Sequence, residues 1–392
     1  MTAPAAPTPS IALLAFAMAL NSMTTHLFTA GMPGAALDLG VSSQVIQLSL
    51  TLSLLGVAVA ELVTGSLSDR FGRRPLALGG GVLFLLCCVV AAFSPGALVL
   101  IAARLFQALG SGAVRVCATA SARDNLTSEQ AARRFGILTV MQAISPMAAL
   151  VIGGLSVAWF GWRSIFVFSA IMGALFLGCA MLWMRETNVQ RKRGAGLVQM
   201  LADFAVLLRQ RRFAGFAVGC AFNNGCFFGL VAAVPFILTG PLHQKPDDVG
   251  LYFALLLAAN ATGLLLVGRL LPRWGAARTA PVGSWSSVIG LVAFLGFSLS
   301  GTLTVTTLCL SLAIYNFGCG FLYPGALTGA IDVDPRRIGA AAGLFSFSIQ
   351  IVGMASATLV GLWSHDLALG VGIIGVAMTA MGRLALLLTR RA

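Results

Sequence analysis

The stretch GSLSDRFGRRP, residues 65–75, is a short break rich in glycine and arginine between two long apolar runs. The run before it covers residues 44–67, and the run after it covers residues 75–94. Each is about as long as the roughly 20 residues that an α-helix needs to cross the hydrocarbon core of a bilayer. The stretch therefore predicts two membrane-crossing helices joined by a tight turn.

The rest of the chain has the same apolar character. Of its 392 residues, 58% are hydrophobic and only 9% are charged, whereas soluble domains carry about 25% charged residues. Its apolar runs are long and lack the period-two alternation of transmembrane strands, which argues against a β-barrel. We predict an all-α polytopic membrane protein with twelve transmembrane helices. These are expected at residues 11–33, 44–67, 75–94, 97–119, 135–158, 163–185, 213–238, 248–270, 278–299, 302–330, 338–360 and 366–389.

The net charge of +13 is distributed unevenly between the two sides of these helices. Of the 25 Lys and Arg residues, 21 lie in the connections after even-numbered spans or at the C-terminal end. Only Arg163 and Lys245 lie in the opposite connections. This positive-inside bias predicts that both termini are cytoplasmic, and it argues against nucleic acid as a partner. We expect the first span to be retained, because no basic residue or cleavage site marks a signal peptide.

The longest polar interruption, residues 186–212, divides the spans six and six. We therefore predict an N-terminal six-helix bundle over 1–185, a cytoplasmic linker over 186–212 and a C-terminal six-helix bundle over 213–392. No GxxxxGK[ST] phosphate loop is present. Any transport is therefore expected to use an ion gradient and no bound cofactor.

The two halves share short segments at one offset. GSLSDRFG at residues 65–72 corresponds to GRLLPRWG at 268–275, and RRFG at 133–136 corresponds to RRIG at 336–339. Both pairs are 203 residues apart. A common offset in corresponding connections predicts an internal repeat, with two parallel bundles related by an axis along the membrane normal.

The residues of the opening stretch are suited to a conformational latch. Gly65 and Gly72 permit close helix approach and a tight turn. Asp69 lies near helix ends, where a fixed charge can hold one helix against another. Arg73 and Asp124 could extend this latch into a chain of ion pairs. The alternative is that the stretch is only a basic loop of the positive-inside kind.

The same stretch resembles the signature of the major facilitator superfamily, which occurs in the corresponding connection. The matching residues are Gly65, Leu67, Asp69, Arg70, Gly72, Arg73 and Arg74. The resemblance implies that the latch stabilises an outward-facing state. The corresponding stretch in the second half, residues 268–275, matches the signature less well, because Pro272 stands where Asp69 would recur.

Spans four and five carry a second resemblance. Residues 104–124 read RLFQALGSGAVRVCATASARD, and residues 142–154 read QAISPMAALVIGG. Together they resemble the drug:proton antiporter branch, and within it the bicyclomycin and chloramphenicol resistance subgroup of bacterial exporters. The resemblance is specific in the first half and mainly topological in the second. It implies a functional span-four arginine and an exporter-type proline–glycine helix in span five. These residues are Arg104, Pro146, Gly153 and Gly154.

Four ionisable residues lie well inside the predicted spans: His26, Glu61, Arg104 and Arg115. Charged groups at membrane depth are costly and by default mark function. Arg104 and Arg115 are eleven residues apart, about three turns along nearly one helix face. Counting positions from the span ends predicts two layers, His26 with Arg104 and, closer to the cytoplasm, Glu61 with Arg115.

The resemblance also bears on His26. Aligning THLFTAGMP, residues 25–33, to the subgroup's first helix puts His26 where an aspartate is expected. We hypothesise that His26 binds and releases the coupled proton or hydrogen-bonds the substrate, with Glu61 as the other candidate carrier. The alternatives are a neutral His26 satisfied by threonine or backbone groups, and a purely structural ion pair between Glu61 and Arg115.

A polyspecific cavity needs apolar area and a few polar handles. Any single polar residue could instead make an interhelical hydrogen bond. Two arginines and one glutamate would leave the cavity neutral or positive, so neutral or anionic substrates are expected over quaternary amines. By analogy with the resembling family, the candidate cavity residues are Asn21, Thr25, His26, Arg104, Gln107, Gln142, Asn223, Asn224, Phe227, Asn260, Tyr315 and Gln350.

The function predicted from sequence is proton-coupled efflux of small amphiphiles by alternating access, in the inner membrane of a bacterium. We expect a monomer whose partners are substrate, protons and lipid, without a metal site. A dedicated exporter of one metabolite, such as a siderophore, and a non-transporting receptor remain alternatives. An importer is disfavoured by the exporter-type fifth span. An enzyme is disfavoured because no acids, histidines or cysteines form a catalytic set.

Overall fold

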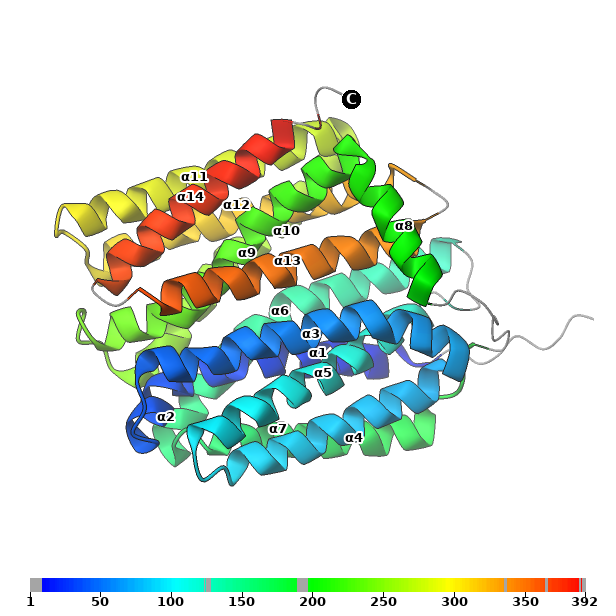
Figure 1. Ribbon diagram of the computed structural model, residues 1–392, viewed down its shortest axis with the longest axis horizontal. Helices are drawn as coiled ribbons and strands as arrows, with labels where there is room; N and C mark the ends of the chain where they lie inside the picture. Colours follow the sequence, from blue (N-terminus) through cyan, green and yellow to red (C-terminus); the bar gives the residue numbers. More distant parts are fainter. Residues whose placement is uncertain are drawn as a thin grey trace, which may run out of the picture.

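The computed structural model describes residues 9–122, 124, 128–188, 197–334, 337–363, 366–387 and 389. Every regular element within these ranges is a helix. Figure 1 shows two groups of helices stacked one above the other, with α8 at the end where the linker lies. The first group comprises α1 (Ile11–His26), η1 (Leu27–Gly31), α2 (Met32–Asp38), α3 (Ser43–Phe71), α4 (Arg73–Ala92), α5 (Ala97–Ser121), α6 (Ser128–Phe160) and α7 (Ser164–Trp183).

The linker contributes a helix of its own, α8 (Leu197–Arg209), which contacts both α3 and α13. Eleven described segments are long and apolar enough to cross a membrane, and α6 adds a shorter apolar segment, Ala148–Phe160. The predicted twelve-helix membrane fold is therefore confirmed.

The second group comprises α9 (Arg211–Thr239), α10 (Pro246–Trp274), α11 (Ala276–Leu299), α12 (Val305–Ile331), α13 (Ile338–Gly361) and α14 (Leu367–Leu387).

The first span differs from the continuous helix predicted over residues 11–33. It is interrupted by the buried 3₁₀ segment η1 and continues through α2 to Asp38. Pro33 lies in the first turn of α2, where the missing N–H of proline costs little. Short 3₁₀ segments within a helix often mark hinges. The interruption places His26 at the end of α1, beside the break.

The predicted repeat has a counterpart in backbone geometry. Gly72 joins α3 to α4 with φ of 105°, and Gly275 joins α10 to α11 with φ of 70°. Glycine adopts this left-handed region without the penalty that a Cβ brings. The two glycines occupy equivalent turns at the 203-residue offset. The bundle boundaries predicted at 185 and 213 stay a prediction, since residues 189–196 lie outside the described ranges.

One apolar core joins the two groups at the end opposite the linker. It combines Phe28 and Leu50 from the first group with Val234, Phe253 and other residues from the second, all fully buried. The side chains of this shared core are close-packed, and they hold the two groups together at this end. We call this the closed end of the molecule.

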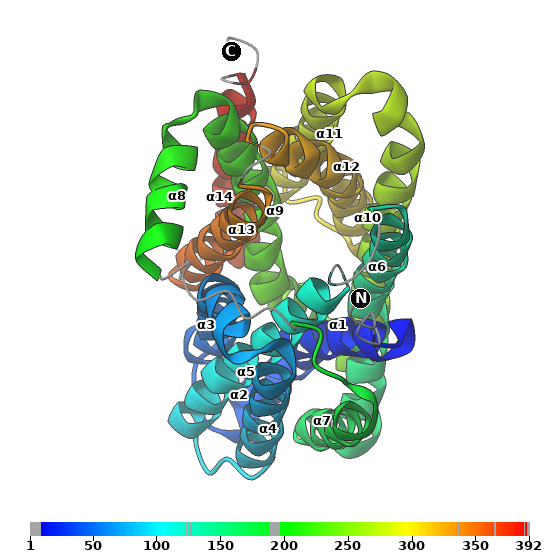
Figure 2. The same cartoon turned by 90° about the vertical axis from the view of Figure 1, so that its right-hand side faces the viewer.

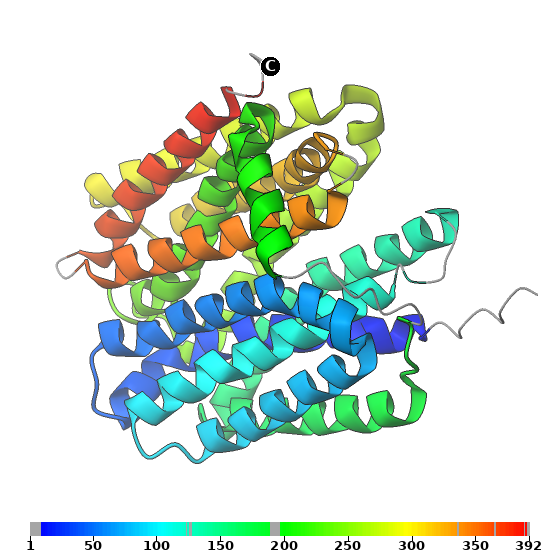
Figure 3. The same cartoon turned by 45° about the vertical axis from the view of Figure 1, so that its right-hand side comes forward.

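At the linker end the cores are separate. One cluster contains residues of α1, α4, α5 and α7, including Leu14 and Phe84. The other contains residues of α8, α9, α12 and α13, including Phe216 and Phe345. Figure 2 looks onto this end, and Figure 3 shows the two groups obliquely. Among the described residues, one apolar core therefore joins the two groups at the closed end, whereas their apolar cores are separate at the linker end, where α8 contacts both α3 and α13.

Glycines of α6 permit the closest contacts of this helix. A Cβ placed on Gly153 would lie 3.2 Å from the carbonyl carbon of Leu27 in η1. A Cβ on Gly250 of α10 would lie 2.6 Å from the Leu150 carbonyl oxygen and 3.4 Å from Cα of Gly154. The glycines of the exporter-type helix therefore pack against the hinge in the first span and against the other bundle.

We expect Gly153→Ala to destabilise the protein by about 1–3 kcal/mol, because the added methyl group meets backbone that cannot rotate away. Thermal unfolding in detergent would measure this as a lower Tm. The matched control is Gly178→Ala in α7, where no described atom lies within 4 Å of the added Cβ. The control should be neutral or slightly stabilising, since alanine favours helix. Equal Tm values for the two variants would contradict the packing role of Gly153.

Candidate transport cavity

A cavity of about 270 Å³ lies between the two groups of helices. Its lining comes from α1, α3, α5 and α6 of the first group and from α9, α10, α12 and α13 of the second. Residues from both groups therefore face a single space. Movement of one group relative to the other would change the shape of this cavity and its access to either side.

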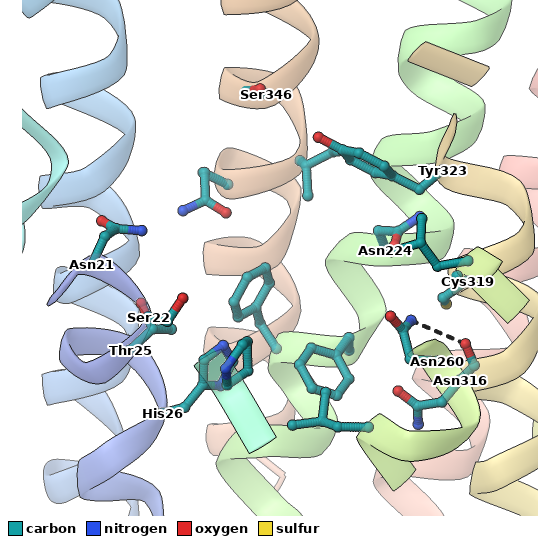
Figure 4. Close-up of a pocket in the computed structure, with 18 of the residues that line it drawn as sticks. Asn21, Ser22, Thr25, His26, Asn224, Asn260, Asn316, Cys319, Tyr323 and Ser346 are labelled. Atoms are coloured by element: carbon teal, nitrogen blue, oxygen red, sulfur yellow. Dashed lines mark hydrogen bonds between the residues drawn. The ribbon is translucent and has the colours of Figure 1, made fainter. Parts of the chain in front are cut away.

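The two walls differ in chemistry (Figure 4). On the α1 side, Asn21, Ser22, Thr25 and His26 follow one another along a single helix face. The wall opposite carries amides, a thiol and a phenol, together with the apolar surface of phenylalanine and leucine side chains. Its polar members are Asn224, Asn260, Asn316, Cys319 and Tyr323. Such a lining suits a ligand with substantial apolar area and a few hydrogen-bonding groups.

His26 lies at the end of the cavity nearest the closed end. Its ring centroid is 6.0 Å from that of Phe227 across the cavity. The His26 side chain is buried, and its Nδ1 has no hydrogen-bond partner among the described residues. The predicted alternative of a histidine satisfied by threonine or backbone is therefore not seen at Nδ1. A proton or a substrate group remains a suitable partner for this nitrogen.

Arg104 lies behind this wall, close enough to His26 for their charges to interact. It is 1% exposed and is the largest fully buried side chain among the described residues. Its Nη1 donates to Oε1 of Gln107 at 2.8 Å, and its guanidinium lies 5.5 Å from the ring centroid of Phe28. Nε and Nη2 have no partner in the described structure. A buried cation with no carboxylate partner among the described residues is costly to keep in the fold.

The second predicted layer is an ion pair. Nη2 of Arg115 on α5 contacts Oε1 of Glu61 on α3, and the side chains are 16% and 6% exposed. The positions of Glu61 and Arg115 along their helices predicted this pairing. Tyr323 of α12 lies close enough to interact electrostatically with Arg115. The pair thus stands at the cavity wall where the first group faces the second.

Not every predicted cavity residue reaches the wall. Arg104, Gln107, Asn223 and Tyr315 lie behind it in this conformation, and the side chain of Gln142 lies outside the described part of the structure. The predicted residues on the wall are Asn21, Thr25, His26, Asn224, Phe227, Asn260 and Gln350. The sequence analysis did not predict several residues that lie on the wall. These include Ser22, Asn316, Cys319, Tyr323 and Ser346.

Asn223 and Tyr315 instead hold helices of the second group together. The Tyr315 hydroxyl donates to the Asn223 carbonyl oxygen at 2.7 Å, and both side chains are fully buried. The Asn223 amide donates to Gly219 of its own helix at 2.9 Å. The sequence alone could not separate them from neighbours such as Asn224, because adjacent helix positions differ in direction by about 100°.

The predicted latch forms within the first group. Nη2 of Arg73 lies 2.7 Å from Oδ1 of Asp69, and its Nε lies 3.3 Å from Oδ2 of Asp124. Nη1 of Arg73 also contacts Ser68. Thr187 donates to the same Asp124 oxygen at 2.7 Å. The arginine therefore links the ends of α3 and α5 and the segment that follows α7.

One predicted feature of the latch is not seen in this conformation. A Cβ on Gly65 would meet no described atom within 4 Å, so the close helix approach expected there is absent. Arg70 is exposed and lies over the ring of Phe71 at 5.2 Å. The latch contacts described here lie within one group, whereas a role in gating would require contact with the other group in a second conformation.

Sequence reasoning missed one residue of the latch, Glu186. Its carboxylate accepts the backbone N–H of Arg73 at 2.9 Å and that of Arg74 at 3.2 Å. It thereby caps the N-terminus of α4, where N–H groups have no intrahelical partner. Asn188 in turn donates to the Asp69 carbonyl oxygen at 2.9 Å, in the last turn of α3. No local motif predicts such a cap, because Glu186 is more than a hundred residues away in the chain.

We expect Glu186→Ala to speed hydrogen exchange at the Arg73 and Arg74 amides by roughly 5–30-fold, which corresponds to the typical value of a cap, about 1–2 kcal/mol. The control is Asp366→Ala, which removes a similar cap from α14, where Asp366 accepts from Ala368 at 2.9 Å. The control variant should speed hydrogen exchange at the start of α14 and leave the exchange rates of the Arg73 and Arg74 amides unchanged. Unaltered exchange at α4 in the Glu186 variant would contradict the cap.

A second charged cluster binds the linker helix to the second group. Nε of Arg337 lies 2.8 Å from Oδ1 of Asp203 on α8, and its Nη1 lies 2.6 Å from Oδ2 of Asp334. Hydrogen bonds from Arg337 to Asp203 and then Asp334 hold the pKa of Arg337 above its usual value. This cluster occupies the connection equivalent to that after span four, where the first group has Asp124.

Two bundles of membrane-crossing helices, sealed at one end around a polar cavity, define a membrane transporter. The sequence profile of the Major Facilitator Superfamily matches residues 14–357, and the chain belongs to this family.

Comparisons with individual proteins agree with this assignment. Multidrug resistance protein D of Escherichia coli (strain K12) is 29% identical over 387 residues, which cover 96% of this chain and 93% of that protein. A chloramphenicol resistance protein of Pseudomonas aeruginosa is 30% identical over 274 residues, covering 70% of this chain and 64% of that protein. These relatives confirm the predicted resemblance to the drug-exporter branch. A solved D-xylose–proton symporter shares the fold, with a TM-score of 0.76 at 14% identity over 95% of this chain and 96% of that chain.

Proposed function

We propose that this protein exports small amphiphilic compounds in exchange for protons. The observation that carries the proposal is the cavity between the bundles, which combines a polar α1 face with an apolar and amide-rich wall. The positive-inside distribution supports a placement in which the linker end faces the cytoplasm. In that placement the joined apolar core lies toward the outside and the separate cores lie toward the cytoplasm, as expected of an exporter that takes up substrate from the cytoplasm.

The proposed mechanism is alternating access. Movement of the two bundles would break the apolar packing at the closed end and bring the linker ends together. The interruption at η1, between α1 and α2, places a hinge beside His26. Proton binding or substrate binding at His26 would therefore act on the element that is best placed to bend. Proton coupling needs no further cofactor in this scheme.

The substrate is proposed to be neutral or anionic. Glu61 and Arg115 neutralise each other, whereas Arg104 contributes a positive charge without a described carboxylate partner. A cationic ligand would be repelled by this field, and a neutral or acidic one would not. The names of the relatives support an amphiphilic drug-like substrate. Arg104 also favours the second candidate function, a dedicated exporter of one anionic metabolite.

Two measurements test the proposal. Cells that produce the protein should gain tolerance to neutral or acidic amphiphiles, and preferential tolerance to quaternary ammonium compounds would refute the predicted selectivity. In proteoliposomes, addition of substrate should drive proton movement that is reduced in His26→Ala and Glu61→Gln variants. Unchanged coupling in both variants would exclude both residues as proton carriers. Transport of one compound alone from a broad panel would favour the dedicated exporter.

We further propose that the protein acts as a monomer in the inner membrane of a bacterium, with both termini in the cytoplasm. The basic connections support this orientation, and the central cavity is complete within one chain. No protein partner is required for the transport cycle outlined here. Labelling of single cysteines placed in the connections would test the orientation directly.

A further inference from the structure

The amide groups on the second-bundle wall of the transport cavity are held in one orientation. Nδ2 of Asn260 donates to the backbone carbonyl oxygen of Asn316 at 3.0 Å, and Nδ2 of Asn316 donates to that of Leu312 at 2.9 Å. A backbone carbonyl can only accept a hydrogen bond, so each contact requires the amide nitrogen and cannot be made by the amide oxygen. Both side chains therefore turn their nitrogens toward the helix backbone.

The oxygens of these side chains are turned the other way. Figure 4 shows Oδ1 of Asn260 and of Asn316 directed toward the α1 face of the cavity. Among the described residues, no hydrogen bond is donated to either oxygen. Asn224 follows the same pattern, since its Nδ2 contacts the carbonyl oxygen of Cys220 at 3.5 Å and its Sγ at 3.2 Å. We call Asn224, Asn260 and Asn316 the acceptor wall, because they present amide oxygens to the cavity.

The acceptor wall is rigid, because α10 and α12 pack backbone to backbone at this level. A Cβ on Gly263 would lie 3.0 Å from the backbone nitrogen of Phe321, and a Cβ on Gly320 would lie 2.9 Å from the carbonyl carbon of Asn260. Small residues at such positions let two membrane helices approach closely. The amide oxygens are therefore held in place before a ligand binds, which lowers the entropic cost of binding.

The α1 face offers the complementary group. Oδ1 of Asn21 accepts from the Ser111 hydroxyl at 3.5 Å, and its Nδ2 is turned toward the cavity (Figure 4). A ligand between the two walls can therefore accept a hydrogen bond from Asn21 and donate one to the acceptor wall. A ligand without an O–H or N–H group would leave the oxygens of Asn260 and Asn316 unpaired. Unpaired buried polar groups are costly, so such a site discriminates against the analogue that lacks the donor.

We propose that the transport cavity selects neutral amphiphiles that carry a hydrogen-bond donor, and that Asn260 and Asn316 determine this specificity. The inference rests on the proposed export of small amphiphiles and names the group by which they are recognised. Alcohols, phenols and secondary amides satisfy the acceptor wall, whereas ethers, tertiary amides and quaternary ammonium groups have no donor. A protonated primary amine also carries donors, but the positive charge of Arg104 disfavours it.

The test compares matched ligands by thermal unfolding of the full-length protein in detergent. The probes are para-hexylphenol with its methyl ether, and N-hexylbenzamide with its N-methyl derivative. In each pair, methylation removes the donor and keeps an acceptor. The dependence of Tm on ligand concentration gives an apparent affinity for each compound. We expect the wild type to prefer the donor member of each pair, and this preference to fall roughly 5–20-fold in Asn260→Leu/Asn316→Leu.

Two matched controls separate specificity from general damage. Asn223→Leu makes the same change at a fully buried asparagine behind the wall, and it should leave the preference unchanged. Asn21→Leu removes the donor of the opposite wall, and it should weaken both members of each pair alike, because both keep an acceptor. Partitioning of a probe into detergent is the same for every variant, so a change in the preference reports the protein. If the double variant does not fold, Asn260→Leu alone carries the test, since this side chain is only half-buried.

An unchanged preference in Asn260→Leu/Asn316→Leu, or an equal fall in Asn223→Leu, would overturn the acceptor wall as the source of specificity. Equal Tm shifts by both members of each pair in the wild type would overturn it too, while the proposed export of amphiphiles would stand. If neither pair raises the Tm of the wild type, the proposed export of neutral amphiphiles fails, and this inference fails with it. A Tm that rises with sodium chloride but not with choline chloride, and only when both asparagines are present, would identify a cation site instead.

Discussion

Replacing Glu61 by glutamine is expected to destabilise the protein by about 3 kcal/mol and to abolish substrate-driven proton movement. The variant leaves Arg115 without its carboxylate partner at a site where the two side chains are only 16% and 6% exposed. Removing one partner of a buried pair typically costs about 3–5 kcal/mol, and we expect the lower end because water reaches this wall through the cavity. Thermal unfolding in detergent and proton flux in proteoliposomes would measure the two effects.

The double variant Glu61→Gln/Arg115→Gln separates the two interpretations of the pair. Removing both charges should restore most of the lost stability, because no uncompensated charge remains. If Glu61 serves only to neutralise Arg115, proton-coupled transport should return as well. If Glu61 carries the proton, coupling should stay absent in a stable protein. The proton-carrier role is therefore refuted by a double variant that transports normally.

A matched control is available on the opposite side of the membrane. Asp38 pairs with Arg163, and these side chains are 49% and 42% exposed. Exposed pairs typically contribute less than about 1 kcal/mol. Asp38→Asn should therefore leave both the Tm and the proton flux nearly unchanged. A loss comparable with that of Glu61→Gln would show that any broken pair impairs this protein.

Replacing Arg104 by methionine is expected to stabilise the fold by about 1–2 kcal/mol while reducing transport to the background of empty liposomes. The guanidinium is 1% exposed, with one neutral hydrogen-bond partner and no described carboxylate nearby. Replacing buried charge by an apolar side chain of similar volume is often stabilising by about 1–4 kcal/mol. Loss of the stacking on Phe28 offsets part of this gain.

The physical reason for the expected loss of transport is that Arg104 places a positive charge close enough to interact with buried His26. A costly buried charge persists where function requires it. Gln107→Glu provides a second test, since it would place a carboxylate beside Nη1 and pair the charge without removing it. We expect this variant to keep its Tm and to lose coupling. Normal transport by Arg104→Met would contradict any role of the guanidinium in the cycle.

The sequence predicted the positions of some ionisable residues of the site better than those of its neutral polar residues. The pairing of Glu61 with Arg115 was predicted correctly, because charges are so costly in a membrane that the depth of each residue indicates its partner. Arg104 was predicted to line the cavity and lies behind its wall. The neutral residues were placed poorly. Asn223 and Asn224 are adjacent and identical in type, yet one holds Tyr315 and the other faces the cavity. The sequence contains no signal that states which face of α9 turns inward.

The latch illustrates the same limit. Its ion pairs among Asp69, Arg73 and Asp124 follow from a local motif and a plausible neighbouring helix end. The cap supplied by Glu186 does not, because it depends on where the chain runs after α7. Gly65 shows the reverse case, since the motif predicts a close contact that this conformation leaves open.

The sequence by itself determined that this chain crosses a membrane twelve times in two related halves. The properties that showed this are the length and hydropathy of the apolar runs, the basic connections and the repeated turn, all of which can be read along the chain. A bilayer imposes a fixed length on each helix and a large penalty on each buried charge, and both constraints can be read residue by residue. Which end of the molecule is sealed, where the first helix breaks and which polar groups share a cavity depend on contacts between helices far apart in the chain. Only the tertiary structure decided these, because helix rotation and packing are settled jointly by all neighbours.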